Sequence, residues 1–540
     1  MSKIKKISVI AFLVISVAVS VAYKSDFFEI AKQIEIYTTL FKELNMYYID
    51  EINPAKINQV GINSMLHSLD PYTRFYDEQG IETVRINANG QFGGTGAISK
   101  FRGNKLIVTD IYQNTPASKA SVFIGDEILA INNIKINAKQ KESTLSQLRG
   151  LPDTEITLKL KRQDKVIEKK LKLSSIIQNP VSFSTMLAKN TGYIVLSRFN
   201  EKAFDEVESA FLKLKEQGMT QLVLDLRANP GGLLNQAIDI VSLFVPKGQL
   251  VVSTKAKVKK WSNTYRTQKE PLDISMPLVV LVNGRSASAS EIVSGALQDL
   301  DRAVIVGQRS YGKGLVQRYR KLSYGTQFKL TISKYYTPSG RNIQELDYTN
   351  RKGDSIPKFS DLKRPEYKTK NGRKILGGGG IAPDVKVTLN KQSETTKKLL
   401  KSQAVFKFAT QYFYKHKTIN SAENFKLSQT DFKNFTSFLK SEDIFVSPVQ
   451  KSFKKSSDLA TKANINIEKT LSKLNAEIVS KQFSQLQQDK TIIEEKLALE
   501  IVRRYYFSEG KYTYALQNDK ILQKALSVLN DTTIYQKLLH

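Results

Sequence analysis

The segment Ser286-Ala-Ser-Ala-Ser-Glu291 carries side chains well placed for chemistry, because it directly follows the apolar run 278–282. Such a run predicts a buried strand, and a helical pattern begins after the serines. A serine at a strand-to-helix turn is exposed, and the free N–H groups and positive dipole end of the helix can stabilise an oxyanion. Ser288 is therefore a candidate nucleophile, with the N–H of Ala289 as an oxyanion donor. Ser288 and Glu291 also fit a helix capping box, and the local pattern does not separate Ser288 from Ser286.

The supply of general bases is limited, because the chain has no cysteine and only three histidines, His67, His416 and His540. The absence of cysteine excludes thiol catalysis and Cys-based zinc or iron–sulfur sites. The histidines share no ligand spacing, which argues against a histidine triad or a multi-histidine metal site. No metal, nucleotide or other cofactor is expected. Lysine is the remaining base once it is desolvated.

Lys313 lies between two glycines in Tyr311-Gly-Lys-Gly-Leu-Val-Gln317, so its backbone can approach other groups closely. If Lys313 faces Ser288 in a dry pocket, desolvation lowers its pKa and lets it accept the serine proton. Gln317 could orient the amine by a hydrogen bond without holding it charged. The glycine spacing does not match a phosphate-binding loop, and a surface lysine is the alternative interpretation.

A third segment, Asp225-Leu-Arg-Ala-Asn-Pro-Gly-Gly232, follows another apolar run, 222–226. Its glycines allow a tight turn with exposed N–H groups, which suits the second half of an oxyanion hole. Taken by itself, a simple strand-to-helix turn explains this segment equally well.

Together and in this order, segments 225–232, 286–291 and 311–317 resemble the carboxy-terminal processing peptidases, also called tail-specific proteases. The step of 25 residues from Ser288 to Lys313 also suits that family. The resemblance covers about residues 26–390 and is greatest to long members with a helical C-terminal region. It implies a serine endopeptidase with a crotonase/ClpP-like α/β core, in which Ser288 is the nucleophile and Lys313 the general base. It further implies that Gln317 orients the lysine and that the N–H groups of Gly232 and Ala289 form the oxyanion hole.

The segment Phe92-Gly-Gly-Thr-Gly-Ala-Ile98 resembles the loop and strand of a PDZ domain that receive the terminal carboxylate of a peptide. In this mode the peptide adds as an extra strand, and backbone N–H groups bind its carboxylate. The resemblance implies that the peptide-binding residues are Gly94, Thr95, Gly96, Ala97 and Ile98. Ser121 and Asn133 stand where the family usually has glycine. Asparagine tolerates a positive φ, whereas Ser121 can reshape its turn.

The hydrophobic periodicity predicts an α/β (α+β) multidomain chain of five parts. Lys3, Lys5 and Lys6 precede the apolar stretch 7–21, which is short for a membrane span and ends near the small residues 20–22. Residues 1–25 are therefore interpreted as a signal peptide or N-terminal anchor. The other parts are a helical region at 26–82, a PDZ domain at 83–175, a peptidase core at 176–392 and a helical domain at 393–540.

Export predicts a location in the periplasm or cell envelope, with membrane association through the N-terminus. The 540 residues carry a net charge of +31, but the lysines are spread along the chain, which favours a lysine-rich surface over nucleic-acid binding. The expected partners are proteins or peptides with exposed C-terminal tails. The sequence leaves the oligomeric state open, although the helical tail offers an assembly surface for a homo-oligomer. The rival hypothesis is a non-catalytic PDZ-bearing scaffold or chaperone on a peptidase-like fold.

Overall fold

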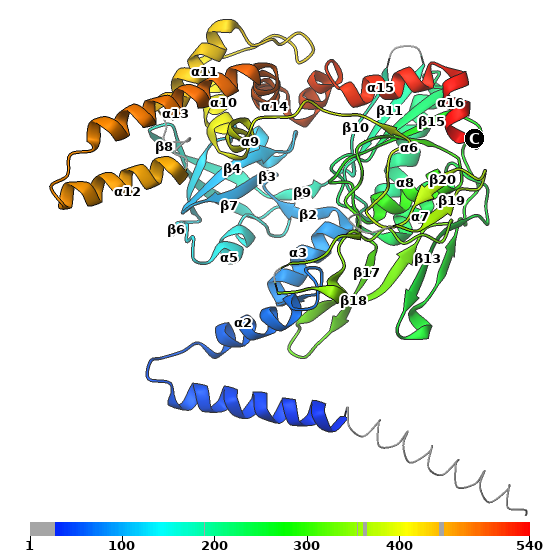
Figure 1. The fold of residues 1–540 in the computed structure, drawn as a ribbon, viewed down its shortest axis with the longest axis horizontal. Helices are drawn as coiled ribbons and strands as arrows, with labels where there is room; N and C mark the ends of the chain where they lie inside the picture. The colour runs from blue at the N-terminus through cyan, green and yellow to red at the C-terminus, as the bar shows by residue number, and fades with distance from the viewer. Residues whose placement is uncertain (1–26, 188–189, 354, 360–363, 442–447) are drawn as a thin grey trace, which may run out of the picture. The chain divides into compact units, whose positions relative to one another are not determined.

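The computed structural model describes residues 27–187, 190–353, 355–359, 364–441 and 448–540 (Figure 1). The predicted export segment, residues 1–25, lies outside them. The chain divides into two units, one ending at Phe75 and the other running from Tyr76 to His540. Among the described residues, no helix combines the length and the apolar character needed to cross a bilayer.

The first unit is a helical hairpin. A helix over residues 27–47 is followed by α2 (Pro54–His67), whose N-cap Asn53 accepts from Lys56 N at 3.0 Å. The hydroxyl of Tyr37 donates to Asn58 Oδ1 at 2.6 Å and joins the two helices. Both helices lie in the part predicted to be helical, 26–82, but none of the residues from 27 to 65 is buried. The short strand β1 (Arg74–Tyr76) lies at the boundary between the two units.

A six-stranded sheet forms the centre of the second unit, in the order β10-β11-β12-β15-β16-β21. Its strands are parallel except for the antiparallel pair β10–β11. Strands β12 and β15 are buried at every residue, as their continuous apolar runs predicted. The bounds are β10 (Val181–Leu187), β11 (Thr191–Leu196), β12 (Gln221–Asp225), β15 (Leu278–Val282), β16 (Val304–Gly307) and β21 (Val385–Lys386).

Helices cover both faces of this sheet, which confirms the predicted α/β class. One face packs on α6 (Ala203–Glu216), α7 (Leu234–Ser242) and α8 (Ala289–Asp299). The other face packs on α15 (Lys520–Leu529) and α16 (Thr532–Leu539), the last two helices of the chain (Figure 1). These last two helices thus belong to the layer that completes the sheet.

A second, antiparallel sheet lies directly after the loop of the lysine candidate, because β17 begins two residues beyond Lys313. Within the second unit it joins β17 (Leu315–Lys321), β18 (Gln327–Tyr336), β13 (Leu250–Ala256) and β14 (Thr264–Arg266). The register of β17 against β18 shifts between Val316 and Gln317. Smaller elements nearby are the 3₁₀ helices Lys259–Trp261 and Tyr348–Asn350 and the ribbon of β19 (Glu366–Lys368) and β20 (Lys374–Leu376).

The part predicted to be a PDZ domain, residues 83–175, is called the β-rich insertion here. It forms a separate sheet ordered β3-β4-β5-β7-β8, with β6 paired to β5. The ribbon of β2 and β9 brings the two ends of the insertion together. Ser121 and Asn133 have φ values of 56° and 67°, so both take the positive φ that glycine adopts readily. The elements are α3 (Glu78–Asn89), β2 (Gln91–Gly94), β3 (Ala97–Arg102), β4 (Lys105–Ile111), α4 (Pro116–Lys119), β5 (Glu127–Ile131), β6 (Ile134–Lys135), α5 (Lys141–Ser146), β7 (Glu155–Arg162), β8 (Lys165–Lys172) and β9 (Ser174–Ile177).

The remaining helices form their own core and also pack on the β-rich insertion. The Tyr414 hydroxyl donates to Asp126 Oδ1 at 3.2 Å, and Asp126 is itself paired with Arg162 at 2.7 Å. Gly125 lies so close to α10 that a Cβ there would be 2.4 Å from Thr410 Cγ2. The bounds are α9 (Glu394–Lys401), α10 (Ala404–Lys415), α11 (Gln429–Ser441), α12 (Pro448–Lys462), α13 (Glu468–Gln488) and α14 (Lys490–Leu516).

This close approach yields a first prediction. We expect Gly125→Ala to weaken the packing of the insertion on α10 by about 2 kcal/mol, because the added methyl overlaps Thr410. Gly103→Ala is the control, since Gly103 also has a positive φ but no atom lies within 4 Å of its Cβ position. Thermal unfolding should show a lower melting temperature for Gly125→Ala than for Gly103→Ala, and equal values would contradict the contact.

Candidate active site

The three alternating serines occupy different environments. Ser286 and Ser290 are fully buried, and their hydroxyls donate to the carbonyl oxygens of Leu226 at 2.8 Å and Asn229 at 2.9 Å. Ser288 is only half-buried. The hydroxyls of the two outer serines therefore hold the loop to the 226–229 segment. Ser288 is the one of the three that solvent can reach, a distinction that the local sequence pattern could not make.

Ser288 has a strained backbone, with φ 56° and ψ −113° immediately before α8. A non-glycine residue in such a conformation costs free energy and persists only where its surroundings impose it. Here Ala287 N donates to Asn229 O at 3.0 Å, and Ser288 N donates to Glu291 Oε2 at 2.8 Å. Strain of this kind concentrates at functional sites.

Glu291 connects the serine loop to the lysine loop. Its carboxylate is fully buried and accepts four hydrogen bonds. Oε2 accepts from Ser288 N at 2.8 Å and Lys313 N at 2.9 Å, while Oε1 accepts from Ser310 Oγ and Gly312 N, both at 2.6 Å. The capping box predicted only the first of these bonds. The backbones of Ser288 and Lys313 are thus held by the same oxygen atom.

The chemistry of these partners favours an ionised Glu291. Burial raises the pKa of the Glu291 carboxyl, and the four hydrogen bonds, which act in the opposite direction, offset only part of that rise. Three of the donors are backbone N–H groups, and Ser310 Oγ accepts from Ile381 N at 2.7 Å, so its own proton points to the carboxylate. A protonated Glu291 would place its own O–H group against groups that are themselves hydrogen-bond donors, which is unfavourable.

The lysine loop is framed on its other side by the segment 342–345. Gly314 N donates to Gln344 Oε1 at 2.7 Å, and Glu345 N donates to Gly312 O at 2.9 Å. Gly312 has φ 86°, and a Cβ there would lie 2.5 Å from Glu345 Cβ. The glycines beside Lys313 are therefore required by close backbone approach, as the sequence predicted. Lys313 itself is half-buried.

Gln317, the predicted orienting residue, lies on β17 and is half-buried. Its Nε2 donates to Thr331 Oγ1 on β18 at 3.2 Å. The amide is thereby oriented by the neighbouring strand. Its action on Lys313 stays a prediction.

The glycine turn packs directly against the serine loop. A Cβ on Gly231 would lie 2.8 Å from Ala289 N, and one on Gly232 would lie 2.1 Å from Phe199 O. Asn229 orders the turn, because its side chain accepts from Gly231 N at 2.9 Å and donates to Leu196 O at 2.8 Å. Within the described residues, neither Gly232 N nor Ala289 N donates a backbone hydrogen bond. Both candidate oxyanion donors therefore retain their hydrogen-bonding capacity.

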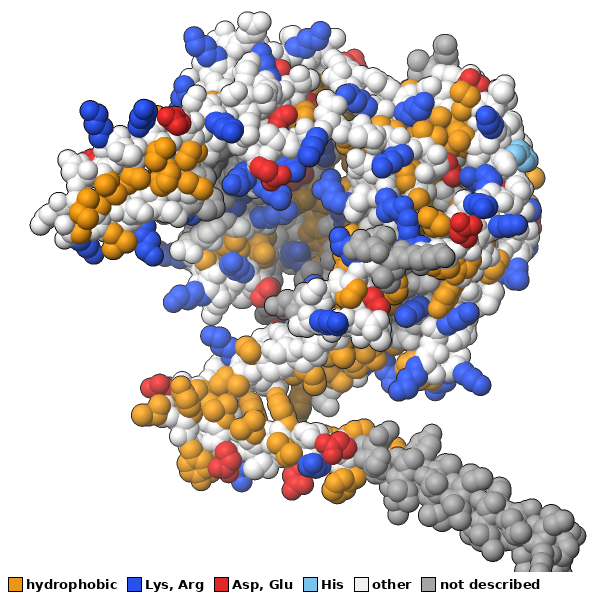
Figure 2. Space-filling model, in the orientation of Figure 1, with side chains coloured by type: hydrophobic (Ala, Val, Ile, Leu, Met, Phe, Trp, Pro, Cys, Tyr) orange, Lys and Arg blue, Asp and Glu red, His pale blue; other side chains and the backbone are white. Residues whose placement is uncertain are grey.

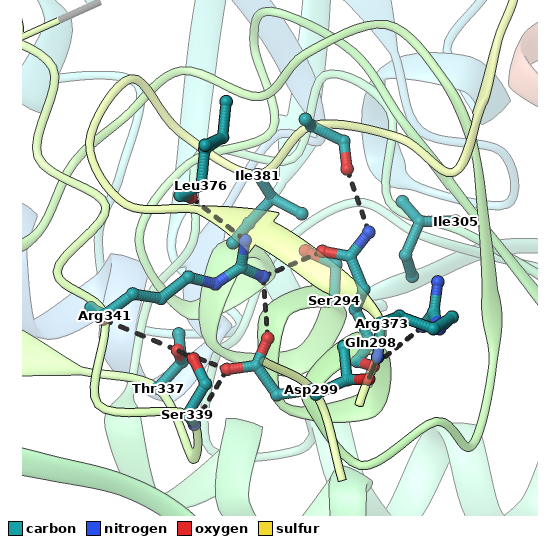
Figure 3. A network of polar contacts seen from close by, with 12 residues as sticks. Ser294, Gln298, Asp299, Ile305, Thr337, Ser339, Arg341, Arg373, Leu376 and Ile381 are labelled. Atoms are coloured by element: carbon teal, nitrogen blue, oxygen red, sulfur yellow. Dashed lines mark hydrogen bonds and ion pairs between the residues drawn. The ribbon is translucent and has the colours of Figure 1, made fainter. Parts of the chain in front are cut away.

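The far end of α8 is fixed by a buried ionic network (Figure 3). Arg341 is bonded to Asp299 at 2.7 Å and to Gln298 Oε1 at 2.8 Å, and both charged side chains are almost wholly inaccessible. Asp299 also accepts from Ser339 N at 3.0 Å and from the Thr337 hydroxyl. None of these residues was predicted from the sequence, although Gln298 and Asp299, two polar residues at the end of a mostly apolar helix, were a usable signal.

The peptide-binding residues predicted in the β-rich insertion lie at an open sheet edge. Ala97 and Ile98 start β3, the terminal strand of its sheet, so its outer side is available for an added strand. Thr95 is buried and its Oγ1 accepts from Ala97 N at 3.1 Å. Gly96 has φ 80°, and a Cβ there would collide with Thr115. Gly94 forms an antiparallel bridge with Arg149, which closes the base of the loop.

Family comparisons match three parts of the chain. Residues 80–173 match the PDZ domain, 190–349 match peptidase family S41, and 395–529 match the C-terminal helical domain of probable PDZ-proteases. A carboxy-terminal-processing protease of Bartonella bacilliformis is 36% identical over 324 residues, covering 59% of this chain and 74% of the relative. A CtpA-like serine protease of Staphylococcus aureus, itself named as probable, is 31% identical over 372 residues, covering 68% and 71%. Among solved structures, the photosystem II D1 C-terminal processing protease is 24% identical, covering 65% of this chain and 92% of that chain, with a TM-score of 0.36.

The shared carboxylate yields a second prediction. We expect Glu291→Gln to slow acylation of Ser288 by a serine-directed probe about 100-fold, because a neutral amide loses ~3 kcal/mol of hydrogen bonding to the two loops. Labelling rates measured by intact-mass spectrometry test this. The control is Glu366→Gln, which removes an exposed pair with Lys374. Equal labelling of Glu291→Gln and the control would show that the carboxylate does not position the serine.

Proposed function

Because the chain belongs to the carboxy-terminal-processing proteases, as its motifs predicted, we propose that it is an exported serine endopeptidase with a Ser288–Lys313 catalytic dyad that cuts proteins near their C-termini. The observation that carries this proposal is the shared bond to Glu291 Oε2, which holds the backbones of the two residues side by side. The strain at Ser288 supports it further, because strain of this kind is expected at a reactive group.

The reaction begins when uncharged Lys313 accepts the proton of the Ser288 hydroxyl. The serine oxygen attacks the substrate carbonyl, and the resulting oxyanion is stabilised by the N–H groups of Ala289 and Gly232. Collapse breaks the C–N bond, and the lysine returns its proton to the leaving amine. Water then attacks the acyl-enzyme with Lys313 again as base, which releases the acid and restores Ser288. Gln317 orients the lysine amine during these steps.

Recognition of the tail is assigned to the PDZ domain. The substrate would pair with the free edge of β3, and the N–H groups of the Gly94–Gly96 loop would receive its terminal carboxylate. This binding mode reads an exposed C-terminus rather than a folded surface. It therefore favours substrates whose tails are unstructured.

The proposed location is supported by the sequence of residues 1–25, which would direct export to the periplasm or cell envelope. The net charge of +31 would help to retain the protein near anionic envelope components. The alternative function is a non-catalytic PDZ-bearing scaffold or chaperone. The strain at Ser288 argues against it, because a strained backbone at an accessible serine lowers stability and contributes nothing to a purely binding role.

A third prediction tests the dyad. We expect Ser288→Ala and Lys313→Met each to abolish cleavage of a tail-bearing substrate, since one removes the nucleophile and the other the base, while the melting temperature stays near that of the wild type. Ser290→Ala is the matched control, because it deletes the buried bond to Asn229 and should lower stability more than chemistry. Normal cleavage by either dyad variant would remove that residue from the mechanism, and a wild type that neither cleaves nor is acylated would favour the scaffold.

For the partners, we propose that a second copy of the chain covers the helical hairpin 27–67. Its exposed apolar side chains include five aromatic rings between 48% and 71% accessible, and Figure 2 shows such side chains gathered over both helices. No residue from 27 to 65 is buried, so the two helices do not cover each other's apolar side chains, and a contiguous apolar surface of this kind is typical of an interaction site. The large apolar side chains exposed on the hairpin are Phe27, Phe28, Ile30, Ile34, Ile36, Tyr37, Leu40, Met46, Tyr47, Tyr48, Ile49, Val60 and Met65.

Size and charge favour self-association of this hairpin. Aromatic side chains bury ~150–250 Å² each, so five of them supply most of the ~800 Å² per partner that a specific interface needs. Residues 27–69 carry three lysines and five acidic residues, whereas the whole chain has a net charge of +31. Two copies that meet through their hairpins therefore avoid the repulsion between their basic surfaces. A basic amphipathic helix, which anionic membranes prefer, is not what this segment offers.

A fourth prediction follows. We expect the full chain to sediment as a dimer at micromolar concentration and the variant Ile34→Asp/Leu40→Asp to sediment as a monomer. Ile274→Asp, at an exposed apolar residue of the second unit, is the control and should leave the dimer intact. A monomeric wild type, or a hairpin that is covered only in the presence of anionic lipid vesicles, would overturn the proposed partner.

A further inference from the structure

Arg227 joins the active-site turn to a helix nearly 300 residues away. It follows β12 directly, and its Nε donates to both carboxylate oxygens of Asp225 at 2.9 Å. The same guanidinium reaches Asp519, with 2.8 Å from Nη1 to Oδ1 and 2.6 Å from Nη2 to Oδ2. The Tyr193 hydroxyl completes the cluster by donating to Asp225 Oδ2 at 2.6 Å.

Asp519 also starts the helix that closes the outer face of the peptidase sheet. Its Oδ1 accepts from Ile521 N at 3.0 Å and Leu522 N at 3.1 Å, so it is the N-cap of α15. The first turn of α15 is buried against the sheet through Ile521 and Leu522. The docked helix therefore presents a fixed carboxylate to Arg227.

The residues after Arg227 lead straight to the proposed oxyanion donors. Ala228, with φ 59°, donates its N–H to Asn283 Oδ1 at 3.0 Å. Asn229 O accepts from both Ala287 N and Ser290 Oγ, and Gly231 packs against Ala289 N. A shift of Arg227 would therefore move both the glycine turn that follows it and the serine loop that is bonded to that turn.

We propose that Asp519 is a positioning residue: by holding Arg227, the C-terminal helix α15 sets the geometry of the Gly231–Gly232 turn. This inference rests on the proposed function for its effect on catalysis. The peptidase site is then competent only while α15 is docked, and the C-terminal helices become a structural part of it.

The charges of the cluster allow this role to be tested without unfolding the protein. Burial would raise the pKa of Asp519, but the hydrogen bond and charge of Arg227, with the N–H groups of Leu522 and Ile521, lower it overall. Asp225 alone balances the charge of Arg227, so neutralising Asp519 leaves no unpaired buried cation. Asparagine is also as good an N-cap as aspartate, which preserves the start of α15.

The decisive variant is Asp519→Asn in the full chain. In Asp519→Asn we expect kcat to fall about tenfold, with KM for a tail-bearing peptide nearly unchanged. In Asp519→Glu, which keeps the negative charge, we expect a smaller fall in kcat. The matched control is Asp531→Asn, because Asp531 caps α16 in the same way but makes no contact with Arg227. Hydrogen exchange of a peptide spanning 226–234 should be faster in Asp519→Asn than in the control.

The outcomes separate this proposal from the peptidase proposal. If Ser288→Ala abolishes cleavage while Asp519→Asn keeps the wild-type kcat, the positioning role is overturned and the dyad stands. A loss of kcat that only follows a lower melting temperature also overturns it. If the wild type does not cleave at all, unchanged exchange in 226–234 overturns the coupling, and faster exchange supports it independently of activity.

Discussion

The site depends on one buried carboxylate that is satisfied only by bringing two distant loops together. Glu291 has no access to water, so its charge must be balanced by hydrogen bonds within the protein. The four donors come from the serine loop and from residues 310–313, and none of them could be replaced by solvent. The cost of leaving such a group unpaired makes the approach of the two loops a condition of folding, and the juxtaposition of Ser288 and Lys313 follows from it.

Helix α8 transmits this constraint to the rest of the core. Every one of its residues is buried, and its two ends are held by different polar networks, Glu291 at the start and Asp299 with Arg341 at the finish. A helix fixed at both ends and packed along its whole surface cannot rotate or slide without breaking buried ionic contacts. The dipole end beside Ser288 therefore keeps one orientation.

The C-terminal helices contact two different parts of the second unit. Helices α10 and α14 pack on the PDZ domain, with Tyr414 bonded to Asp126 and Thr410 against Gly125. The last two close the outer face of the peptidase sheet, where Tyr535 hydrogen-bonds the backbone of Leu278. One continuous helical region thus contacts both the PDZ domain and the sheet whose strand β15 leads into the Ser288 loop.

The local patterns of the sequence determined the strands, the α8 cap and the glycines of the turns, because apolar period and backbone freedom are properties of neighbouring residues. The roles expected of Ser288, Lys313 and Gln317 came from the family resemblance. Local patterns also predicted a helical region at 26–82 but could not say that many of its apolar side chains would be exposed. Tertiary structure alone decided that Ser288, rather than Ser286, is accessible, that Glu291 also holds Lys313, and that Asp519 meets Arg227. These choices depend on which donors and acceptors come within about 3 Å of each other after segments far apart in the chain have packed, a distance that no local pattern contains.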